Sequence, residues 1–291
     1  MTPEEGITKE LSLGEVVSKT FELCRRNFVK YTVLFLVVEV VIGLASVWAY
    51  GAFPLPTLPA SATTSQDIAN WASGFFTNLI YLIGVVGIVS LVFGTIAYGS
   101  TIRMASEEVE NKPVDLSEAV RFAASKMPWM WVLGIVLGII IGLGFIALII
   151  PGIILVIMFS VSFQALLVEN AGIGGSLRRS RELVSHRWLK TFAVFLVFAI
   201  IIGIAATIAS AISAPFGYWS QLVSSLLSAF YQPIIPVATT VYFYSNRARI
   251  APAFPVSAVM PAPGMKFCPN CGTQLLTSAT FCPNCGAKQP A

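Results

Sequence analysis

The sequence predicts an all-α membrane protein: a six-helix transmembrane bundle with amphipathic helices at one interface, followed by a small cysteine-rich ribbon. Three observations carry this prediction. Of the 291 residues, 56% are hydrophobic and only 11% are charged, whereas ordinary soluble domains carry about 25% charged residues. Six apolar segments are long enough to be membrane spans, and four of the five cysteines lie in two similar turns near the C-terminus.

The six apolar segments are the predicted transmembrane helices, because about 20 helical residues cross a hydrocarbon core of roughly 30 Å. In chain order they are Tyr31–Tyr50, Leu79–Ile102, Trp129–Ile150, Ile153–Val168, Thr191–Ala214 and Leu222–Tyr244. The third and fourth are joined only by Pro151-Gly152, so a re-entrant pair is the alternative to two crossings. Pro233 and Pro236 remove backbone donors inside the sixth segment and predict a kink there.

Charge is completely segregated between the loops. All 18 Lys and Arg residues lie before the first segment, between the second and third, between the fourth and fifth, or after the sixth. The other three connections hold a single charged residue, Asp67. By the positive-inside rule, this pattern predicts a multi-pass protein of the cell membrane with both termini in the cytoplasm.

A sequence pattern recurs where the basic loops enter the apolar segments. Leu13–Lys30 matches Ile173–Lys190 at a constant offset of 160 residues, and Leu116–Trp129 is a looser copy. Apolar residues at helical spacing, with cations on the other face, predict amphipathic helices at the cytoplasmic interface. We therefore expect three units, each an amphipathic helix followed by a helical hairpin. The alternative is that the basic juxtamembrane helices of any multi-span protein look alike.

Two nearly identical turns, Cys268-Pro269-Asn270-Cys271-Gly272 and Cys282-Pro283-Asn284-Cys285-Gly286, predict a metal site. Each Cys-x-x-Cys turn directs two thiolates at one ion, and two turns complete a tetrahedron. One Zn²⁺ ion is expected on Cys268, Cys271, Cys282 and Cys285. Iron is the less favoured alternative, and two disulfides are disfavoured by a reducing cytoplasm. The fifth cysteine, Cys24, is expected to be a buried apolar residue.

Composition divides the chain into three parts. Residues 1–245 form the six-span membrane domain, residues 246–264 a linker with four prolines, and residues 265–291 the zinc ribbon. The last part is too short to fold without metal.

Glu39 is the ionisable residue that lies clearly inside an apolar segment. A charge there costs at least ~2.5 kcal/mol, so the side chain must be protonated or have a partner. It marks either an intramembrane site on a polar or proton pathway or a hydrogen-bonded carboxyl, near the cytoplasmic third of the helix, that reaches toward a Lys or Arg at the interface.

Glu169 ends the fourth segment, just before a glycine- and arginine-rich loop. It is expected to order the turn through a structural ion pair with Arg178 or Arg181. The arginines expected to contact the interface or anionic lipid headgroups are Arg178, Arg179, Arg181 and Arg187. No Gly-Lys-Ser/Thr follows the glycines, which argues against a nucleotide-binding loop.

A family resemblance rests on Ile149–Ile153, on Val168-Glu169-Asn170, and on Ser176–Ser180 through Trp188. These stretches resemble the membrane domain associated with glycerophosphoryl diester phosphodiesterases and the related stand-alone six-span proteins of bacteria and archaea. The chain has no counterpart of the catalytic barrel of those enzymes, so the resemblance implies a membrane bundle without their activity. The tail is similar to the zinc-ribbon appendage of prokaryotic membrane proteins.

These patterns favour a non-enzymatic protein, because His186 is the only histidine and no paired carboxylates or open metal site are visible. We expect a membrane scaffold that displays a cytoplasmic zinc ribbon to dock a protein partner. The alternative is a small-molecule or lipid transporter with Glu39 in its pathway and the proline-broken sixth helix as the moving part. The lipid bilayer is an expected partner. Nucleic acid is not, because the ribbon carries only Lys266 and Lys288.

Overall fold

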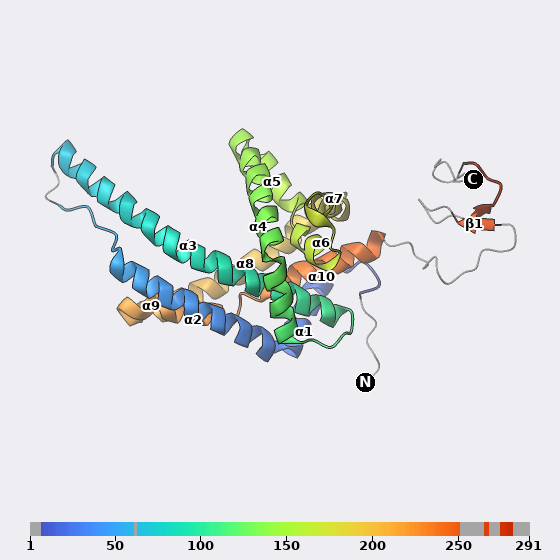
Figure 1. Ribbon diagram of the computed structural model, residues 1–291, viewed down its shortest axis with the longest axis horizontal. Helices are drawn as coiled ribbons and strands as arrows, with labels where there is room; N and C mark the ends of the chain where they lie inside the picture. Colours follow the sequence, from blue (N-terminus) through green and yellow to red (C-terminus); the bar gives the residue numbers. More distant parts are fainter. Residues whose placement is uncertain (1–6, 61–62, 251–264, 268–273, 282–291) are drawn as a thin grey trace.

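The computed structural model describes residues 7–60, 63–250, 265–267 and 274–281. Within these residues the chain forms ten α-helices, one 3-10 helix and one two-stranded sheet (Figure 1). The elements are α1 (Leu13–Arg26), α2 (Phe28–Ala52), α3 (Ser65–Val109), α4 (Leu116–Ala147), α5 (Ile149–Met158), α6 (Ser162–Val168), α7 (Gly172–Val184), α8 (Trp188–Ser213), η1 (Ala214–Trp219), α9 (Ser220–Ser228), α10 (Ile234–Ile250), β1 (Met265–Phe267) and β2 (Gln274–Leu276).

Local sequence signals set where several helices begin. α1 and α3 each start with a capping box, in which the Ser12 or Thr64 hydroxyl accepts from a backbone N–H three residues later. The acidic residue at that later position, Glu15 or Asp67, accepts from the cap backbone in return. Asp115 caps α4 in the simpler way, through its side chain alone.

Three helical hairpins project from a common polar end. They are α2–α3, α4–α5 and α8–α9, and in Figure 1 the first and last extend to the left while α4–α5 points upward. We call the polar end the region formed by α1, the last turns of α3, α6, α7 and α10. A side chain of α10 ties the N-terminal segment to it, because the Ser245 hydroxyl accepts from the Leu11 N–H at 2.8 Å.

The hairpins expose apolar side chains where a bilayer would contact them. On α8, the side chains at every fourth position are half or more exposed: Ile200, Ile204, Ile208 and Ile212. Such contiguous apolar surface is rare on proteins that fold in water. Together with the length and composition of the helices, this identifies a helical membrane protein.

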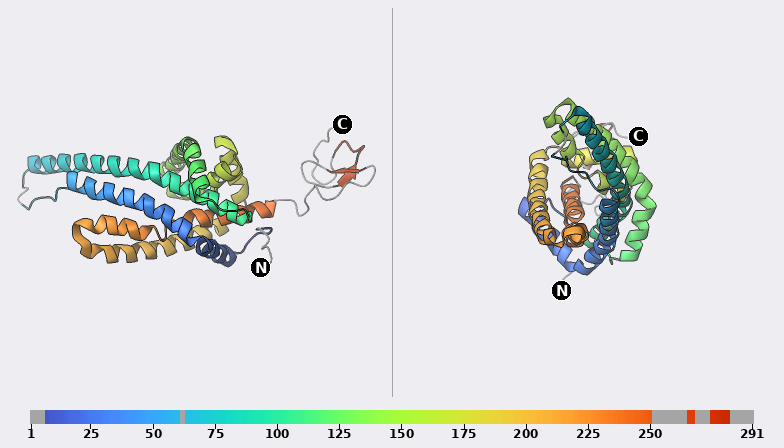
Figure 2. Two further views of the ribbon diagram at one scale, coloured as in Figure 1. Left: turned by 60° about the horizontal axis from the view of Figure 1, so that its bottom comes forward. Right: turned by 90° about the vertical axis from the view of Figure 1, so that its left-hand side faces the viewer.

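Five helical stretches in the described part of the chain are long and apolar enough to cross a membrane. They are Phe28–Ala52, Ser65–Val109, Leu116–Ala147, Ile149–Val168 and Trp188–Ser228. The last of these contains a reversal, because Gly217 has non-helical backbone angles (φ 54°, ψ −119°). From this point α9 runs back beside α8 and packs along α2 (Figure 2). The sixth expected segment, Leu222–Tyr244, is therefore divided between α9 and α10.

Two expected boundaries differ from the observed ones. The turn between the third and fourth segments lies at Leu148, whose backbone is extended, and not at Pro151-Gly152. Pro151 is instead in the first turn of α5, where a helix needs no N–H donor. The kink predicted at Pro233 is confirmed and is a full break, since α9 ends at Ser228 and α10 begins at Ile234.

The predicted repeat is supported by burial. Seven of the thirteen positions buried in α1 and α2 are also buried in α7 and α8 at the same offset of 160 residues. The matching pairs are Val16 and Ser176, Thr20 and Ser180, Leu23 and Leu183, Tyr31 and Thr191, Leu34 and Val194, Val38 and Phe198, and Ala49 and Ala209. In the middle copy the amphipathic part and the span form one continuous helix, α4, which buries Ala119 and Ala123 in its first turns.

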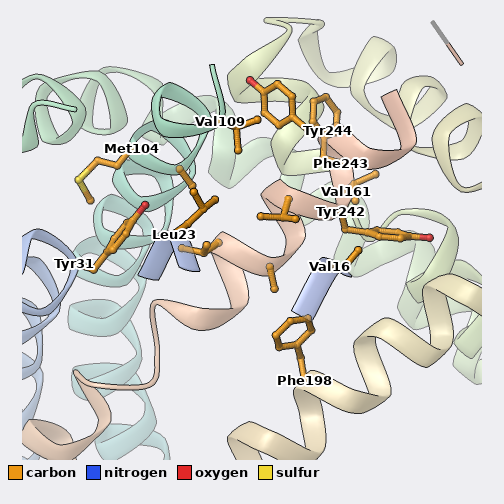
Figure 3. Close-up of a cluster of buried hydrophobic side chains, with 14 of the residues drawn as sticks. Val16, Leu23, Tyr31, Met104, Val109, Val161, Phe198, Tyr242, Phe243 and Tyr244 are labelled. Atoms are coloured by element: carbon orange, nitrogen blue, oxygen red, sulfur yellow. The ribbon is translucent and has the colours of Figure 1, made fainter. Parts of the chain in front are cut away.

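α10 is the centre of the fold. It packs against α1, α3, α6, α7 and α8, and the other helices surround it in the right-hand view of Figure 2. Every residue from Pro236 to Asn246 is buried. Figure 3 shows Tyr242 and Phe243 of α10 among buried side chains from α1, α3 and α8. The third copy of the hairpin unit, which runs from α7 to α10, therefore ends in the core of the bundle, between the first and second copies.

Gly144 is expected to be essential to the α4–α5 hairpin. A Cβ at this position would lie 2.5 Å from Leu155 Cδ1 and 3.2 Å from the Gly152 backbone, whereas Gly142 has nothing within 4 Å. Gly144→Val should lower the stability of the bundle by about 1–3 kcal/mol through overpacking, and Gly142→Val should change it little. Thermal unfolding in detergent, followed by circular dichroism, measures both. Equal shifts for the two variants would show that this approach of the helices is not tight.

Candidate functional site

Glu39 lies on α2 at its contact with the break between α9 and α10. The residue is 4% exposed, and its Oε1 accepts a hydrogen bond from Gln232 Nε2 at 2.6 Å. The same Nε2 donates to Ser228 Oγ at 3.1 Å. The partner of this carboxyl is thus an amide from the broken helix. The expected hydrogen bond of Glu39 is therefore present, but its donor is Gln232 and not a Lys or Arg.

The break itself is hydrogen-bonded within the chain. The N–H groups of Phe230, Tyr231 and Gln232 donate to carbonyls of residues 227 and 228. The side chain of Gln232 is therefore available to cross to α2. A buried carboxyl beside a discontinuous helix is a geometry that transporters use for ions and substrates. The same contact also satisfies the carboxyl without any ligand.

Glu169 forms a bidentate ion pair with Arg179. Arg179 Nε donates to Oε2 at 2.8 Å and Nη2 donates to Oε1 at 3.1 Å. Arg247 of α10 approaches the same carboxylate to 3.8 Å. Partial burial lowers the pKa of Arg179, but the hydrogen bonds and charge of Glu169 outweigh it and hold that pKa above its ordinary value. The predicted partners, Arg178 and Arg181, are wrong: they lie on other faces of α7 and are exposed.

The four arginines expected at the headgroups have different surroundings. Arg179 is committed to Glu169, and Arg187 Nη2 donates to Glu10 Oε2 at 3.1 Å. Burial raises the pKa of Glu10, but Lys190 and Arg187 outweigh it and hold that pKa below its ordinary value. Arg178 is exposed, 3.7 Å from Glu182. Arg181 lines a cavity between α5 and the start of α8. The headgroup prediction is therefore kept for Arg178 and Arg181.

A pair of buried glutamates at the end of α3 was not predicted. Glu107 and Glu108 are each 5% exposed. Arg103 Nε lies 2.7 Å from Glu107, and Arg26 Nε lies 3.7 Å from Glu108. The acidic run directly after an apolar segment is the sequence signal that could have identified this pair.

A three-residue motif that ends two helices, α3 and α6, was also not predicted. Val109-Glu110-Asn111 ends α3 and Val168-Glu169-Asn170 ends α6. Asn111 and Asn170 both adopt positive φ, 55° and 52°, a conformation that commonly ends helices. Glu110 accepts from Tyr244 of α10 at 2.6 Å. Each motif therefore connects one returning helix to α7 or α10, which extends the repeat beyond its predicted region.

The four predicted zinc ligands, Cys268, Cys271, Cys282 and Cys285, lie outside the described residues. Strands β1 and β2 flank the first Cys-x-x-Cys turn in the sequence, and they pair antiparallel with Phe267 opposite Gln274. Four thiols in two Cys-x-x-Cys pairs are the donor set of a structural zinc site. Cys24 is partly buried, and burial together with the nearby Glu108 raises the pKa of its thiol to about 12. It is not a candidate ligand.

The fold and these sites define a helical membrane protein with a C-terminal metal-binding ribbon. Residues 60–246 match the uncharacterised protein family UPF0259, and residues 267–289 match a zinc-ribbon domain. The chain belongs to the uncharacterised family UPF0259, since the first match covers more than half of it, and its zinc-ribbon domain implies zinc binding. No curated protein and no solved structure matches the chain. Neither family match is to a phosphodiesterase-associated domain, so that resemblance stays a prediction.

Proposed function

We propose that this chain is a non-enzymatic, six-span protein of the cell membrane that presents a cytoplasmic zinc ribbon as a docking module for a protein partner. The observation that carries the proposal is the attachment of a zinc-ribbon domain to the polar end of the bundle. α10 ends there at Ile250, and the N-terminal segment is bonded to the same end through Leu11. Leu11 and Ile250, near the two described ends of the membrane domain, thus lie at the same end of the bundle.

The charge distribution supports a cytoplasmic position for the polar end. Cations make long-range contacts there: Lys30 donates to the Val114 carbonyl, Lys126 to Asn170 and Arg187 to Glu10. The opposite tips of the three hairpins contain no Lys or Arg. Since cations stay on the cytoplasmic side, the ribbon lies in the cytoplasm.

Six crossings are supported by the paths of the helices. α2, α4 and α8 lead away from the polar end, whereas α3, α5 with α6, and α9 with α10 return to it. An even number of crossings keeps both termini on one side. Reporter fusions at Gly264 and within Ser61–Ser65 should report opposite faces, and the same face for both would contradict this topology.

The described polar groups support a scaffold more than an enzyme. Glu110 and Glu169 tie helices together through Tyr244 and Arg179. A site of four cysteines has no open coordination position for substrate. We therefore propose one Zn²⁺ ion with a structural role.

Exposed apolar side chains on the ribbon are the proposed contact for the partner. Leu276 is 60% exposed and Phe281 61% exposed. A photo-cross-linker at Leu276 in native membranes should capture one dominant protein. Phe281→Asp should abolish that product while zinc content is unchanged. A cross-linker at Phe76, on the opposite hairpin tip, is the control. No specific product, or one insensitive to Phe281→Asp, would contradict docking.

The second candidate function is transport of a small molecule or lipid through the bundle. The specific observation in its favour is Glu39, a buried carboxyl bonded to Gln232 in the broken helix. This arrangement could exchange partners if α10 moved relative to α2. Glu39→Gln, tested in a liposome transport assay, separates this function from the first.

A further inference from the structure

A cavity of about 300 Å³ lies between α5 and the junction of α7 with α8. We propose that it binds one anionic phospholipid, with an acyl chain in the cavity and the phosphate at Arg181. This inference concerns the membrane domain and does not depend on the ribbon.

The cavity is apolar at depth and polar at its rim. Ile157 of α5 is 6% exposed and Val184 of α7 is 3% exposed, whereas Arg181 and His186 are exposed. All four residues line the cavity. A pocket with an aliphatic floor and a cationic rim complements a molecule with an acyl chain and an anionic head.

Among Arg178, Arg179, Arg181 and Arg187, it is Arg181 whose charge is least compensated. Arg178 and Arg179 both approach Glu182, Arg179 also binds Glu169, and Arg187 binds Glu10. Within the described part of the chain, Arg181 has no acidic partner within 4 Å, and no acidic side chain lines the cavity. A guanidinium of this kind can donate two parallel hydrogen bonds to a phosphate.

The cavity is also at the correct depth for a headgroup. α7 is fixed to the junction of α5 with α6, because Ser180 Oγ donates to the Met158 carbonyl at 2.9 Å and accepts from the Val161 N–H at 3.3 Å. Trp188 begins the membrane helix α8, lines the cavity and is 56% exposed. Tryptophan at the start of a span is typical of the membrane interface. The rim therefore lies where headgroups lie, and the floor lies where acyl chains begin.

The test uses the full-length, zinc-loaded protein in a neutral detergent. Dioctanoyl phosphatidylglycerol and dioctanoyl phosphatidylcholine are titrated, and bound lipid is counted by native mass spectrometry. The parent should bind one phosphatidylglycerol at least tenfold more tightly than phosphatidylcholine. Arg181→Gln should lower the phosphatidylglycerol affinity about tenfold, as loss of a charge-assisted bond predicts. The control is Arg121→Gln, an exposed arginine on α4 that does not line the cavity, and it should stay within about twofold.

Two further measurements test whether the acyl chain occupies the cavity and whether the phosphate group alone is enough for binding. Ile154→Trp should fill the open side of the cavity and weaken both lipids, while circular dichroism and gel filtration check folding. Excess glycerol phosphate should not displace the lipid. Equal affinity of Arg181→Gln and the parent, equal binding of the two lipids, or displacement by glycerol phosphate would each overturn the proposal.

Discussion

Removal of zinc is expected to unfold the ribbon completely and to leave the membrane bundle intact. The two strands are three residues each, and Leu275 is the buried apolar side chain among the described ribbon residues. A hairpin of this size is at most marginally stable in water. Structural zinc contributes about 10–16 kcal/mol of apparent binding free energy in small zinc domains, so the metal decides whether the ribbon folds.

Metal analysis of reduced protein should give one zinc per chain. After chelation, trypsin should cut rapidly at Lys266, while the helical circular dichroism signal and thermal midpoint of the bundle stay unchanged. Cys282→Ser should reproduce the chelated state. The matched control is Cys24→Ser, since a partly buried thiol with a pKa of about 12 carries no thiolate for metal at neutral pH.

Three outcomes would contradict this account. Less than one zinc equivalent per chain would show that the four cysteines do not form a zinc site. Loss of bundle helicity on chelation would show that the bundle depends on the ribbon. Visible absorption from an iron–thiolate centre would show that the site holds iron and not zinc, the alternative left open by the cysteine spacing.

The membrane helices could be predicted from the sequence because their signal is local. Apolar runs, the capping boxes at Ser12 and Thr64, and the breaking effect of Pro233 each depend on a few neighbouring residues. Pro151 misled the prediction, because proline both makes turns and fits the first turn of a helix. Sequence alone did not show which of these applied.

The partners of the charged residues could not be predicted in this way. Arg178, Arg179 and Arg181 are nearly equivalent in sequence, and the pairing of Glu169 depends on how α7 is rotated about its axis. The chain reverses before α7 through Asn170 and Gly172, both at positive φ (52° and 67°). This tight reversal directs Arg179 at Glu169. Similarly, Glu39 and Gln232 are 193 residues apart, and only the packing of the broken helix on α2 brings them together.

Gln232→Leu is expected to be among the most destabilising single changes in the bundle if Glu39 has a structural role. It removes the donor at 2.6 Å from a carboxyl that is 4% exposed. A buried polar group left without its partner costs about 1–3 kcal/mol, and more when charged. Glu39→Gln keeps shape and hydrogen bonding and should unfold at the parent's midpoint. The double variant Glu39→Leu/Gln232→Leu replaces both partners by apolar groups and should recover most of the loss.

Unfolding of detergent-solubilised protein measures these three variants. Ser228→Ala is measured beside them, because Ser228 contacts both Gln232 and the Glu39 carboxyl. Unchanged stability of Gln232→Leu would show that the carboxyl has another partner.

Transport assays in liposomes then decide between the two functions of Glu39. A transport carboxyl must change partner or protonation during each cycle, so Glu39→Gln should fold yet abolish coupled movement of substrate. A structural carboxyl needs only its hydrogen bond, so parent and variant should give equal, null signals. We expect the null result, because Gln232 already satisfies Glu39 and the proposed role belongs to the ribbon. A robust signal in the parent that is lost in Glu39→Gln, with stability retained, would replace the docking scaffold by a transporter.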